Sequence, residues 1–425
     1  MAMRILTSST VRVWTGWTVG RVLLVIVALG VLRVPHTDVA SDVKVIYQGW
    51  AEVLRTGTFP MDDVTWQYPP LAGFVMLVPL WLPGSYFAGF LALVALCDAA
   101  TLHLLVRAGG GARSGAWLWV AAVPLIGPTV YCRFDLVVTT VAVAATLALA
   151  ARPRLAGVLA GLGAMLKVWP VLVLVGAAPR GRIAGRAWAA CAVTCAAVCF
   201  LVAVSTHGGF SFLGFQGARG IEVESVGALP FYAGSMTGLW HGRVAMHYGS
   251  LEFLGRHVHA TSVAMVALSL LAFGLLTLWR LRNRVWTSAT AADAALTAVL
   301  LFTVTSRVIS PQYLVWLLGS AAVCLTVPGT RMRPVAWLLA VAAPLTFLEF
   351  PLYFGELVKR SLLGTSLISA RDLLLVAAAL VACVRLWRAE DGPAADDGGP
   401  LTAVSTAPSE RGPTELPVRP AATVR

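Results

Sequence analysis

The sequence predicts an all-α, polytopic integral membrane protein with about 12 transmembrane helices. Of its 425 residues, 58% are hydrophobic and only 12% are charged, and the mean hydropathy is +0.79. This composition excludes a water-soluble globular protein, and it excludes an intrinsically disordered chain, which needs few apolar residues and many charges. The apolar residues also gather in runs close to the roughly 20 residues that cross a bilayer as a helix.

Each predicted span is an apolar run, because a backbone amide inside the bilayer must find its hydrogen-bond partner within its own segment. The spans lie near residues 17–34, 85–106, 115–130, 136–151, 155–166, 169–179, 187–206, 260–279, 289–305, 311–327, 335–353 and 366–387. The run at 68–82 is too short for a crossing, so we expect a partial or re-entrant helix there.

The distribution of positive charge predicts the orientation of the chain. The net charge of +12 does not gather on one face with aromatic residues, so we expect no nucleic-acid partner. Instead, arginines cluster between spans, as in Arg107 with Arg113 and Arg280 with Arg282. By the positive-inside rule these clusters are cytoplasmic, which predicts a multi-pass protein of the cell membrane.

The same pattern divides the chain into three parts. Residues 1–16 form a cytoplasmic N-terminus, 17–388 form the membrane domain, and 389–425, rich in Pro, Gly, Ala, Ser and Thr, form a disordered cytoplasmic tail. Two substantial loops, at 35–67 and 207–259, then lie outside. In the first of them, apolar residues at helical spacing follow Ser41 and predict an amphipathic helix on the membrane surface.

Asp42 stands in the first turn of that amphipathic helix. On one interpretation its carboxylate only complements the helix dipole. On the other it is an ionised group at the membrane boundary that accepts a proton from a substrate hydroxyl. Asp38, on the same loop, is the rival for the second role.

Several motifs occur in a fixed order along the chain. They are Trp66-Gln-Tyr68-Pro-Pro, Arg133-Phe-Asp135, Leu166-Lys167-Val-Trp-Pro170, Arg219-Gly-Ile-Glu222, Ser306-Arg307-Val-Ile-Ser310-Pro-Gln312-Tyr313 and Glu349-Phe-Pro. With the acidic residue in the first outer loop, this order resembles the family 87 glycosyltransferases, which are membrane enzymes of the GT-C class. The resemblance covers about residues 17–387.

The resemblance implies a GT-C-like membrane fold and a hexosyltransferase that takes its sugar from a polyprenyl-phosphate donor. Mannose is the commonest sugar in the family, frequently in an α linkage, although arabinofuranosyl transfer also occurs. The acceptor is a glycan or glycolipid at the outer face of the bilayer. The family's catalytic base is an acidic residue of the first outer loop, which here matches Asp42.

Four cations are exceptions to the positive-inside pattern, because they lie at outer span ends or in the second outer loop: Lys167, Arg219, Arg307 and Arg133. We expect them to bind the donor phosphate, since guanidinium groups hold phosphate in bidentate fashion and lysine supplies a point charge. The alternatives are snorkelling of the side chains to lipid headgroups and, for Arg133, pairing with Asp135.

Further polar groups beside these cations are candidates for binding substrate: Tyr68, Glu222, Ser310, Gln312, Tyr313 and Glu349. The hydroxyl and amide groups suit sugar hydrogen bonds but equally suit helix caps. Glu349, near the end of an apolar run, belongs either to a site or to a salt bridge. The histidines of the second outer loop match no zinc spacing, and the chain has no phosphate-binding loop, so we expect neither metal nor cofactor.

A second class of function uses the same features. A transporter or flippase of a lipid-linked saccharide would employ the outer cations as a binding vestibule. Against it, the sequence has no mirrored halves, and its polar groups gather at one face rather than near the midplane of the bilayer.

Overall fold

The prediction of an all-α polytopic membrane protein is confirmed. The structure, a computed structural model, describes residues 2–35, 38–179, 182–217 and 219–388; the tail 389–425 lies outside the described residues. Within them, seven helices are long and apolar enough to cross a membrane: α1 (Ala2–Ala28), α4 (Tyr86–Ala108), α8 (Arg182–Ser205), α11 (Val258–Arg282), α12 (Ser288–Thr305), α14 (Arg333–Phe347) with its continuation η7 (Leu348–Leu352), and α16 (Leu362–Trp387).

Shorter helical elements occupy the remaining predicted spans. They are α5 (Ser114–Ala122) with η3 (Pro124–Ile126), α6 (Asp135–Ala148), α7 (Pro153–Leu166), the 3₁₀ helix η5 (Trp169–Gly176) and α13 (Tyr313–Thr326). Lys167 and Val168 separate α7 from η5, and Pro170 stands in the first turn of η5. The break lies where the sequence predicted it, because proline removes a backbone donor and disfavours continuation of the preceding helix.

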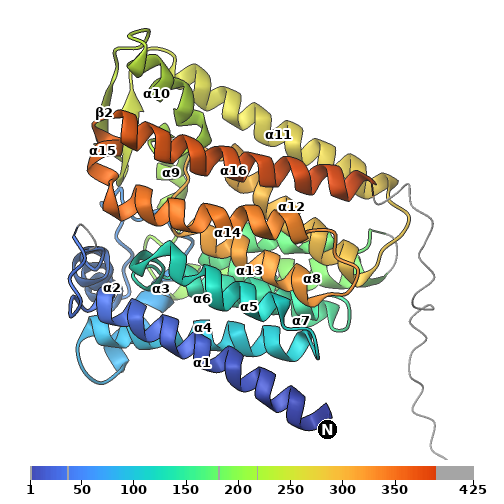
Figure 1. Ribbon diagram of the computed structural model, residues 1–425. Coiled ribbons are helices and arrows are strands. Elements are labelled where there is room, and N and C mark those ends of the chain that lie inside the picture. Colours follow the sequence, from blue (N-terminus) through green and yellow to red (C-terminus); the bar gives the residue numbers. More distant parts are fainter. Residues whose placement is uncertain (1, 36–37, 180–181, 218, 389–425) are drawn as a thin grey trace, which may run out of the picture. The chain divides into compact units, whose positions relative to one another are not determined.

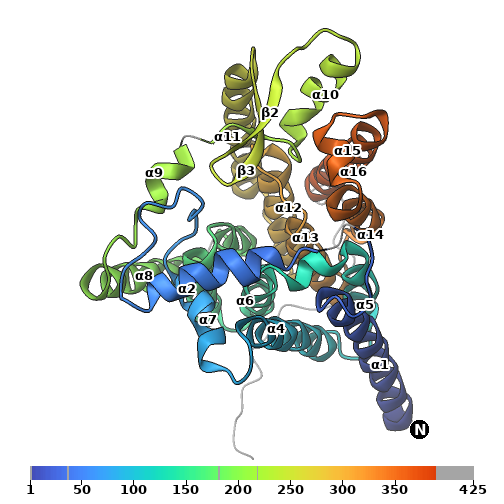
Figure 2. The same ribbon diagram turned by 90° about the vertical axis from the view of Figure 1, so that its left-hand side faces the viewer.

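The long helices lie side by side, and several short elements gather at one end of the bundle (Figure 1). We call this the loop end. It carries α2 (Gln48–Leu54), α10 (Leu229–Met236), α15 (Phe354–Val358) and strand β2 (Arg243–His247), and Figure 2 looks directly onto it. The N-terminus of α1 lies at the opposite end.

The first span differs from the prediction. The helix runs over Ala2–Ala28, with its apolar window at Ser9–Ala28, rather than over 17–34. It ends before Gly30, whose φ of 73° is the left-handed conformation that commonly terminates helices. Residues 2–16, predicted as a separate N-terminus, are therefore part of the first helix.

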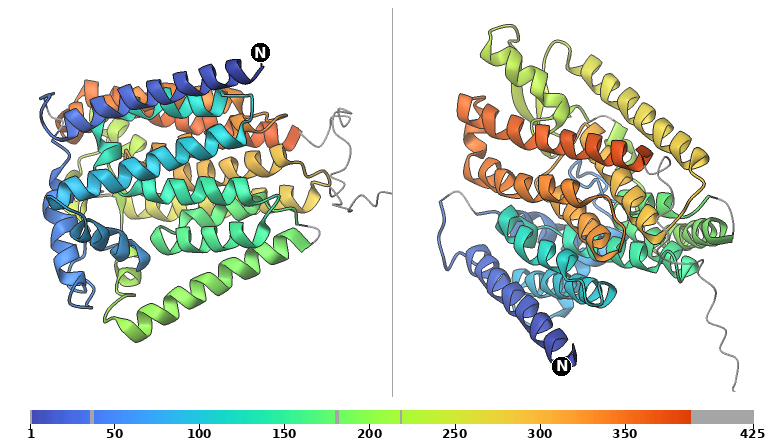
Figure 3. Two further views of the ribbon diagram at one scale, coloured as in Figure 1. Left: turned by 90° about the horizontal axis from the view of Figure 1, so that it is seen from below. Right: turned by 45° about the vertical axis from the view of Figure 1, so that its right-hand side comes forward.

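A buried polar network ties this peripheral helix to the bundle, at whose edge α1 lies in Figure 3. Arg21 of α1 forms a 2.8 Å ion pair with Asp98 of α4. Asp98 also accepts hydrogen bonds from the indoles of Trp17 and Trp119 and from the hydroxyl of Tyr131. A buried charge needs such a set of partners, so loss of one partner would leave a charge uncompensated where α1, α4 and α5 meet.

The predicted amphipathic helix begins at Asp42. Its first turn is the π-helix η1 (Asp42–Tyr47), followed by α2, and one face, with Val43, Tyr47, Trp50 and Leu54, is buried. The short run at 68–82 forms α3 (Leu71–Leu77) and the 3₁₀ helix η2 (Val78–Trp81). The hydroxyl of Tyr86 donates to the carbonyl of Met76, so this segment folds back on the start of α4 at the loop end.

The second loop contains a three-stranded antiparallel sheet that the sequence analysis did not predict. The strands β1 (Ile221–Glu222), β2 and β3 (Ser250–Leu254) pair in the order β1-β3-β2, and η6 (Val226–Ala228) and α10 follow β1. A small apolar core under the sheet includes Ile221, Tyr232 and Phe253. α9 (Phe212–Gly217) precedes the sheet.

Candidate functional site

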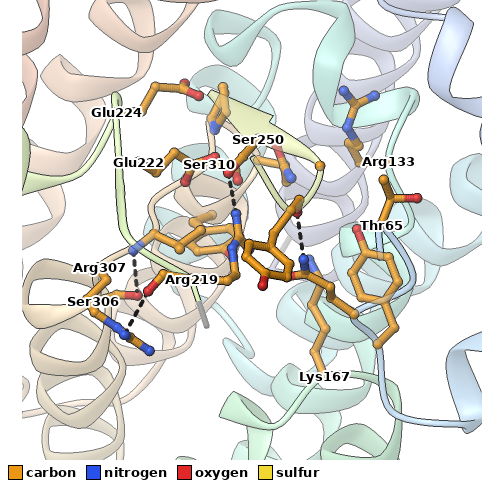
Figure 4. Close-up of a pocket in the computed structure, with 18 of the residues that line it drawn as sticks. Thr65, Arg133, Lys167, Arg219, Glu222, Glu224, Ser250, Ser306, Arg307 and Ser310 are labelled. Carbon is orange, nitrogen blue, oxygen red and sulfur yellow. Dashed lines mark hydrogen bonds between the residues drawn. The ribbon is translucent and has the colours of Figure 1, made fainter. Parts of the chain in front are cut away.

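A cavity of about 730 Å³ opens at the loop end of the bundle. Its lining comes from the first loop, from the turns before α6 and after α7, from the sheet, and from the segment between α12 and α13 (Figure 4). Ten of the predicted site residues border it: Asp42, Tyr68, Arg133, Lys167, Arg219, Glu222, Arg307, Ser310, Gln312 and Tyr313. Asp38 is exposed and outside this lining, and Glu349 is buried beyond it.

Asp42 is held by Arg133 at the edge of the cavity. The Oδ2 atom of Asp42 lies 2.7 Å from Nη2 of Arg133, and the side chain of Asp42 remains 35% exposed. The same guanidinium donates to the carbonyl of Cys132, which fixes its position in the turn before α6. Arg133 therefore pairs with Asp42 and not, as one expectation had it, with Asp135. The carboxylate is oriented by its partner while staying accessible from the cavity.

Lys167 lies in a cage of aromatic rings. Its Nζ atom is 2.7 Å from Oδ1 of Asp135 and within about 5.5 Å of the ring centres of Tyr68, Phe134, Tyr313 and Trp316. The indole of Trp316 donates to the same Asp135 oxygen. Cation–π contacts of this kind stabilise a desolvated ammonium group. The cage holds a positive charge on the wall of the cavity despite its burial.

Arg219 and Arg307 form one hydrogen-bonded unit on the opposite wall. Nη1 of Arg307 donates to the carbonyl of Arg219 at 2.8 Å and to the hydroxyl of Ser262. Arg219 in turn donates to the Ser250 hydroxyl at 2.6 Å and lies 3.7 Å from Glu252. Strand β3 thus positions the guanidinium of Arg219, whereas the backbone of Arg219 and Ser262 of α11 position that of Arg307.

The tip of the β2–β3 hairpin covers part of the cavity and contacts the first loop. The side chain of Gln67 donates to the carbonyl of Tyr248 at 2.6 Å. A Cβ atom on Gly249 would come within 3.0 Å of Thr65, and the φ of Gly249 is 79°, so glycine is required at this close approach. Tyr248, Ser250 and Trp169 also line the cavity, but the sequence analysis did not name them as candidate site residues.

The comparison with known families is decisive for this chain. The family model "Glycosyltransferase family 87" matches residues 66–311, which is more than half of the sequence. The chain belongs to glycosyltransferase family 87. It is therefore a membrane glycosyltransferase, which moves a sugar from a donor to an acceptor. No curated protein and no solved structure matches it.

The matched segment contains most of the cavity of this glycosyltransferase. It spans the four cations and the sheet, whereas Asp42 and Glu349 lie outside it. Asp42 is connected to the matched segment through its ion pair with Arg133. The assignment of individual site residues thus depends on the geometry of the cavity and not on the family match.

Glu349 belongs to a buried cluster behind the cavity of the glycosyltransferase. Its carboxylate lies 4.0 Å from Arg371 of α16, which also pairs with Asp372 at 2.9 Å and donates to the backbone carbonyl of Glu224. The side chain of Glu224 reaches the cavity lining. Glu349 is consequently a salt-bridge residue that supports the cavity wall from behind, one of the two roles expected for it.

A second cavity of about 560 Å³ shares Arg219 and Arg307 with the first. Besides these cations and Glu252, its lining includes the apolar α11 residues Val263 and Val266, which are 54% and 44% exposed. The cavity therefore joins a charged end to an apolar, outward-facing end. Across the described residues, no group of three or more His, Cys, Asp or Glu side chains is placed to hold a metal ion.

Proposed function

We propose that this family 87 enzyme transfers a sugar, foremost mannose in an α linkage, from a polyprenyl-phosphate donor to a glycan or glycolipid hydroxyl. The observation that carries the proposal is the common cavity of Asp42 and the cations Lys167, Arg219 and Arg307. A carboxylate suits proton removal from an acceptor, and a group of cations suits a phosphate. The reaction needs the carboxylate and the cations close to the same sugar.

The cations bind and stabilise the phosphate in this proposal. Arg219 and Arg307 lie next to each other, so together they offer guanidinium donors to phosphate oxygens. Negative charge grows on the phosphate as the bond to the sugar breaks, and prepositioned cations lower the energy of that transition state. Lys167 adds a positive charge from the other wall, although its ion pair with Asp135 partly neutralises that charge.

Asp42 acts as the general base. Arg133 fixes one carboxylate oxygen, and the accessible side chain takes the proton of the acceptor hydroxyl as that oxygen attacks the anomeric carbon. A single displacement of this kind inverts the configuration of the sugar. Tyr68, Ser310, Gln312 and Tyr313 border the same cavity and supply hydrogen-bonding groups for the two sugars.

The cavity faces outward in the proposed topology. The arginine clusters beside the C-termini of α4 and α11 and before α5 and α14 lie at the end of the bundle opposite the loop end. By the positive-inside rule that end is cytoplasmic, so the loop end is extracytoplasmic. The donor then reaches the enzyme through the lipid.

The second cavity suits the isoprenoid tail of that donor. Its charged end contains the two arginines assigned to the phosphate, and its apolar end is exposed on α11, where a spanning helix meets lipid. A lipid phosphate has the same order of charged head and apolar chain. The tail accordingly lies beside Val263 and Val266 while the sugar extends into the first cavity.

Reconstitution tests the function. The purified protein in liposomes is given polyprenyl-phosphate mannose and a mannoside acceptor, and the glycosylated product is measured. Product formation by the wild type, with loss in Asp42→Asn and retention in Asp38→Asn, is the expected result. If the wild type only translocates the labelled donor, the protein is a flippase and the proposal is wrong. If Asp38→Asn alone abolishes turnover, Asp42 is not the base.

A further inference from the structure

Glu222 and Glu252 are directly opposite each other in the small sheet. Strands β1 and β3 pair antiparallel with Glu222 in register with Glu252. Opposite residues of an antiparallel pair project from the same face, with Cβ atoms about 5 Å apart. Both side chains are buried, at 5% and 0% exposure. A buried carboxyl group beside a second carboxyl group is more easily protonated than one in water.

The partners of the two carboxylates decide which one keeps the charge. Glu252 accepts a hydrogen bond from the backbone N–H of Gly220 at 3.0 Å, and it lies 3.0 Å from His247 and 3.7 Å from Arg219. Oε2 of Glu222 and Oε1 of Glu252 are both buried without a hydrogen-bond partner among the described residues, so the two hydrogen bonds within this group converge on Oε2 of Glu252. Glu222 is thus buried beside a second carboxyl group whose own oxygen takes the hydrogen bonds, and this environment favours the protonated form of Glu222.

The remaining charged groups around Glu222 do not reverse this assignment. Those that influence it are Arg219, Glu252, Arg371 and Glu349, and Glu224 lies on the same cavity wall. Burial, opposed by Arg219 and reinforced by Glu252, raises the pKa of Glu222 to about 7. A carboxyl group of this kind holds its proton near neutral pH and releases it readily, as a general acid must.

Glu222 is fixed beside the two arginines. Its backbone N–H donates to the carbonyl of Arg307 at 3.1 Å, and Arg307 donates to the carbonyl of Arg219. All three residues border the first cavity. An anion bound by these arginines therefore lies near the Glu222 carboxyl group. An ionised carboxylate there would repel the anion, whereas a protonated one donates a hydrogen bond to it.

We propose that Glu222 is a catalytic acid that protonates the departing lipid phosphate. This inference rests on the proposed function, because it requires a phosphate leaving group between Arg219 and Arg307.

As the acceptor oxygen bonds to the anomeric carbon, its proton passes to Asp42. The bond between that carbon and the phosphate oxygen breaks, its electron pair stays on the phosphate, and a phosphate oxygen takes the proton of Glu222. The lipid phosphate leaves as a monoanion; solvent then removes the proton from Asp42 and returns one to Glu222.

The pH dependence of turnover tests the role of Glu222. With the acceptor saturating, wild-type kcat/KM for the donor, which reports the free enzyme, falls as pH rises through about 7, because Glu222 must carry its proton. The variant Glu222→Gln keeps a hydrogen-bond donor but has no proton to transfer. We expect its kcat/KM for the donor to be about 100-fold or more lower at pH 6, without the alkaline fall, so that the two enzymes converge at high pH.

Two further variants separate this role from a structural one. In Glu224→Gln, another buried carboxyl group of the cavity wall is changed, and the alkaline fall should persist. In Glu252→Gln the opposing charge is removed, so Glu222 ionises more easily and the fall should move to lower pH by about one unit. A Glu222→Gln enzyme that retains the wild-type kcat/KM for the donor and the alkaline fall would overturn the proposal.

The outcomes also distinguish Glu222 from the overall function. If Glu222→Gln changes only the KM for the acceptor, the residue binds the acceptor and the acid role is wrong, while the glycosyl transfer stands. If the wild type transfers no sugar from polyprenyl-phosphate donors at any pH, the proposed function fails and the acid role with it.

Discussion

The carboxylate of Asp42 meets the guanidinium of Arg133 at 2.7 Å, joining the first turn of the amphipathic helix to the turn before α6. Both groups border the cavity. The pair thus holds a partly exposed carboxylate at a fixed place on the cavity, although that side chain lies in a loop. Asp38, on the same loop, is exposed and outside the cavity lining.

The variant Asp42→Asn is expected to lower kcat by about 10²- to 10⁴-fold, because general-base catalysis contributes that much and an amide does not accept the proton. The measurement is product formation in liposomes with both substrates saturating. Asp38→Asn is the matched control and should remain within a few-fold of wild type. Comparable loss in both variants would contradict the assignment of Asp42.

Arg133 is expected to act through Asp42. Arg133→Gln frees the carboxylate from its partner, so kcat should fall about tenfold or more while the donor KM changes little. Arg133→Lys retains the charge and should recover part of the loss. A rise confined to the donor KM would place Arg133 on the phosphate instead, the role expected from the sequence.

The helical architecture was predictable because the bilayer imposes it. Apolar runs inside a bilayer must be helical, and this alone locates the twelve predicted spans. It also places the break near Lys167 and Pro170. Hydropathy does not, however, specify where a helix ends, so α1 lies earlier in the sequence than expected. Nor does it show the sheet, because β1 has only two residues and its partner β3 lies far along the chain.

The site was predictable as a group of residue types but not as a set of pairs. The positive-inside rule singled out Lys167, Arg219 and Arg307 as exceptions at outer span ends or in the second outer loop. All three border the cavity. The partners of these cations depend on contacts between distant segments. Lys167, for example, pairs with Asp135, which also accepts a hydrogen bond from Trp316. Glu252 has no local signal in the sequence, and its importance appears only from the strand register.

The buried pair of Lys167 and Asp135 yields a stability prediction. Lys167→Met leaves the Asp135 carboxylate buried without its cation, which should lower the free energy of unfolding by roughly 3–5 kcal/mol. The double variant Lys167→Met/Asp135→Asn removes both charges and should regain most of this loss. Unfolding in mixed detergent micelles measures both values. A double variant as unstable as the single one would show that the ion pair is not the cause.

Arg219 and Arg307 are expected to determine donor affinity. Loss of a charge-assisted hydrogen bond costs about 1.5–3 kcal/mol, so Arg219→Ala or Arg307→Ala should raise the donor KM about 10- to 100-fold. The acceptor KM should change little. Arg55→Ala, at an exposed arginine that pairs with Glu52 of α2, is the control and should leave both constants unchanged. Equal increases for donor and acceptor would remove the phosphate role.

The second cavity predicts a dependence on the length of the lipid tail. Val263→Trp and Val266→Trp fill its apolar end without touching the first cavity, so they should raise the KM for long-chain polyprenyl-phosphate donors several-fold. A donor with a short prenyl chain leaves that end empty and should be used equally well by variant and wild type. The control is Val204→Trp, at an exposed valine of α8 outside the lining of both cavities. If the tryptophans slow long and short donors alike, the tail lies elsewhere and the cavity beside α11 has another occupant.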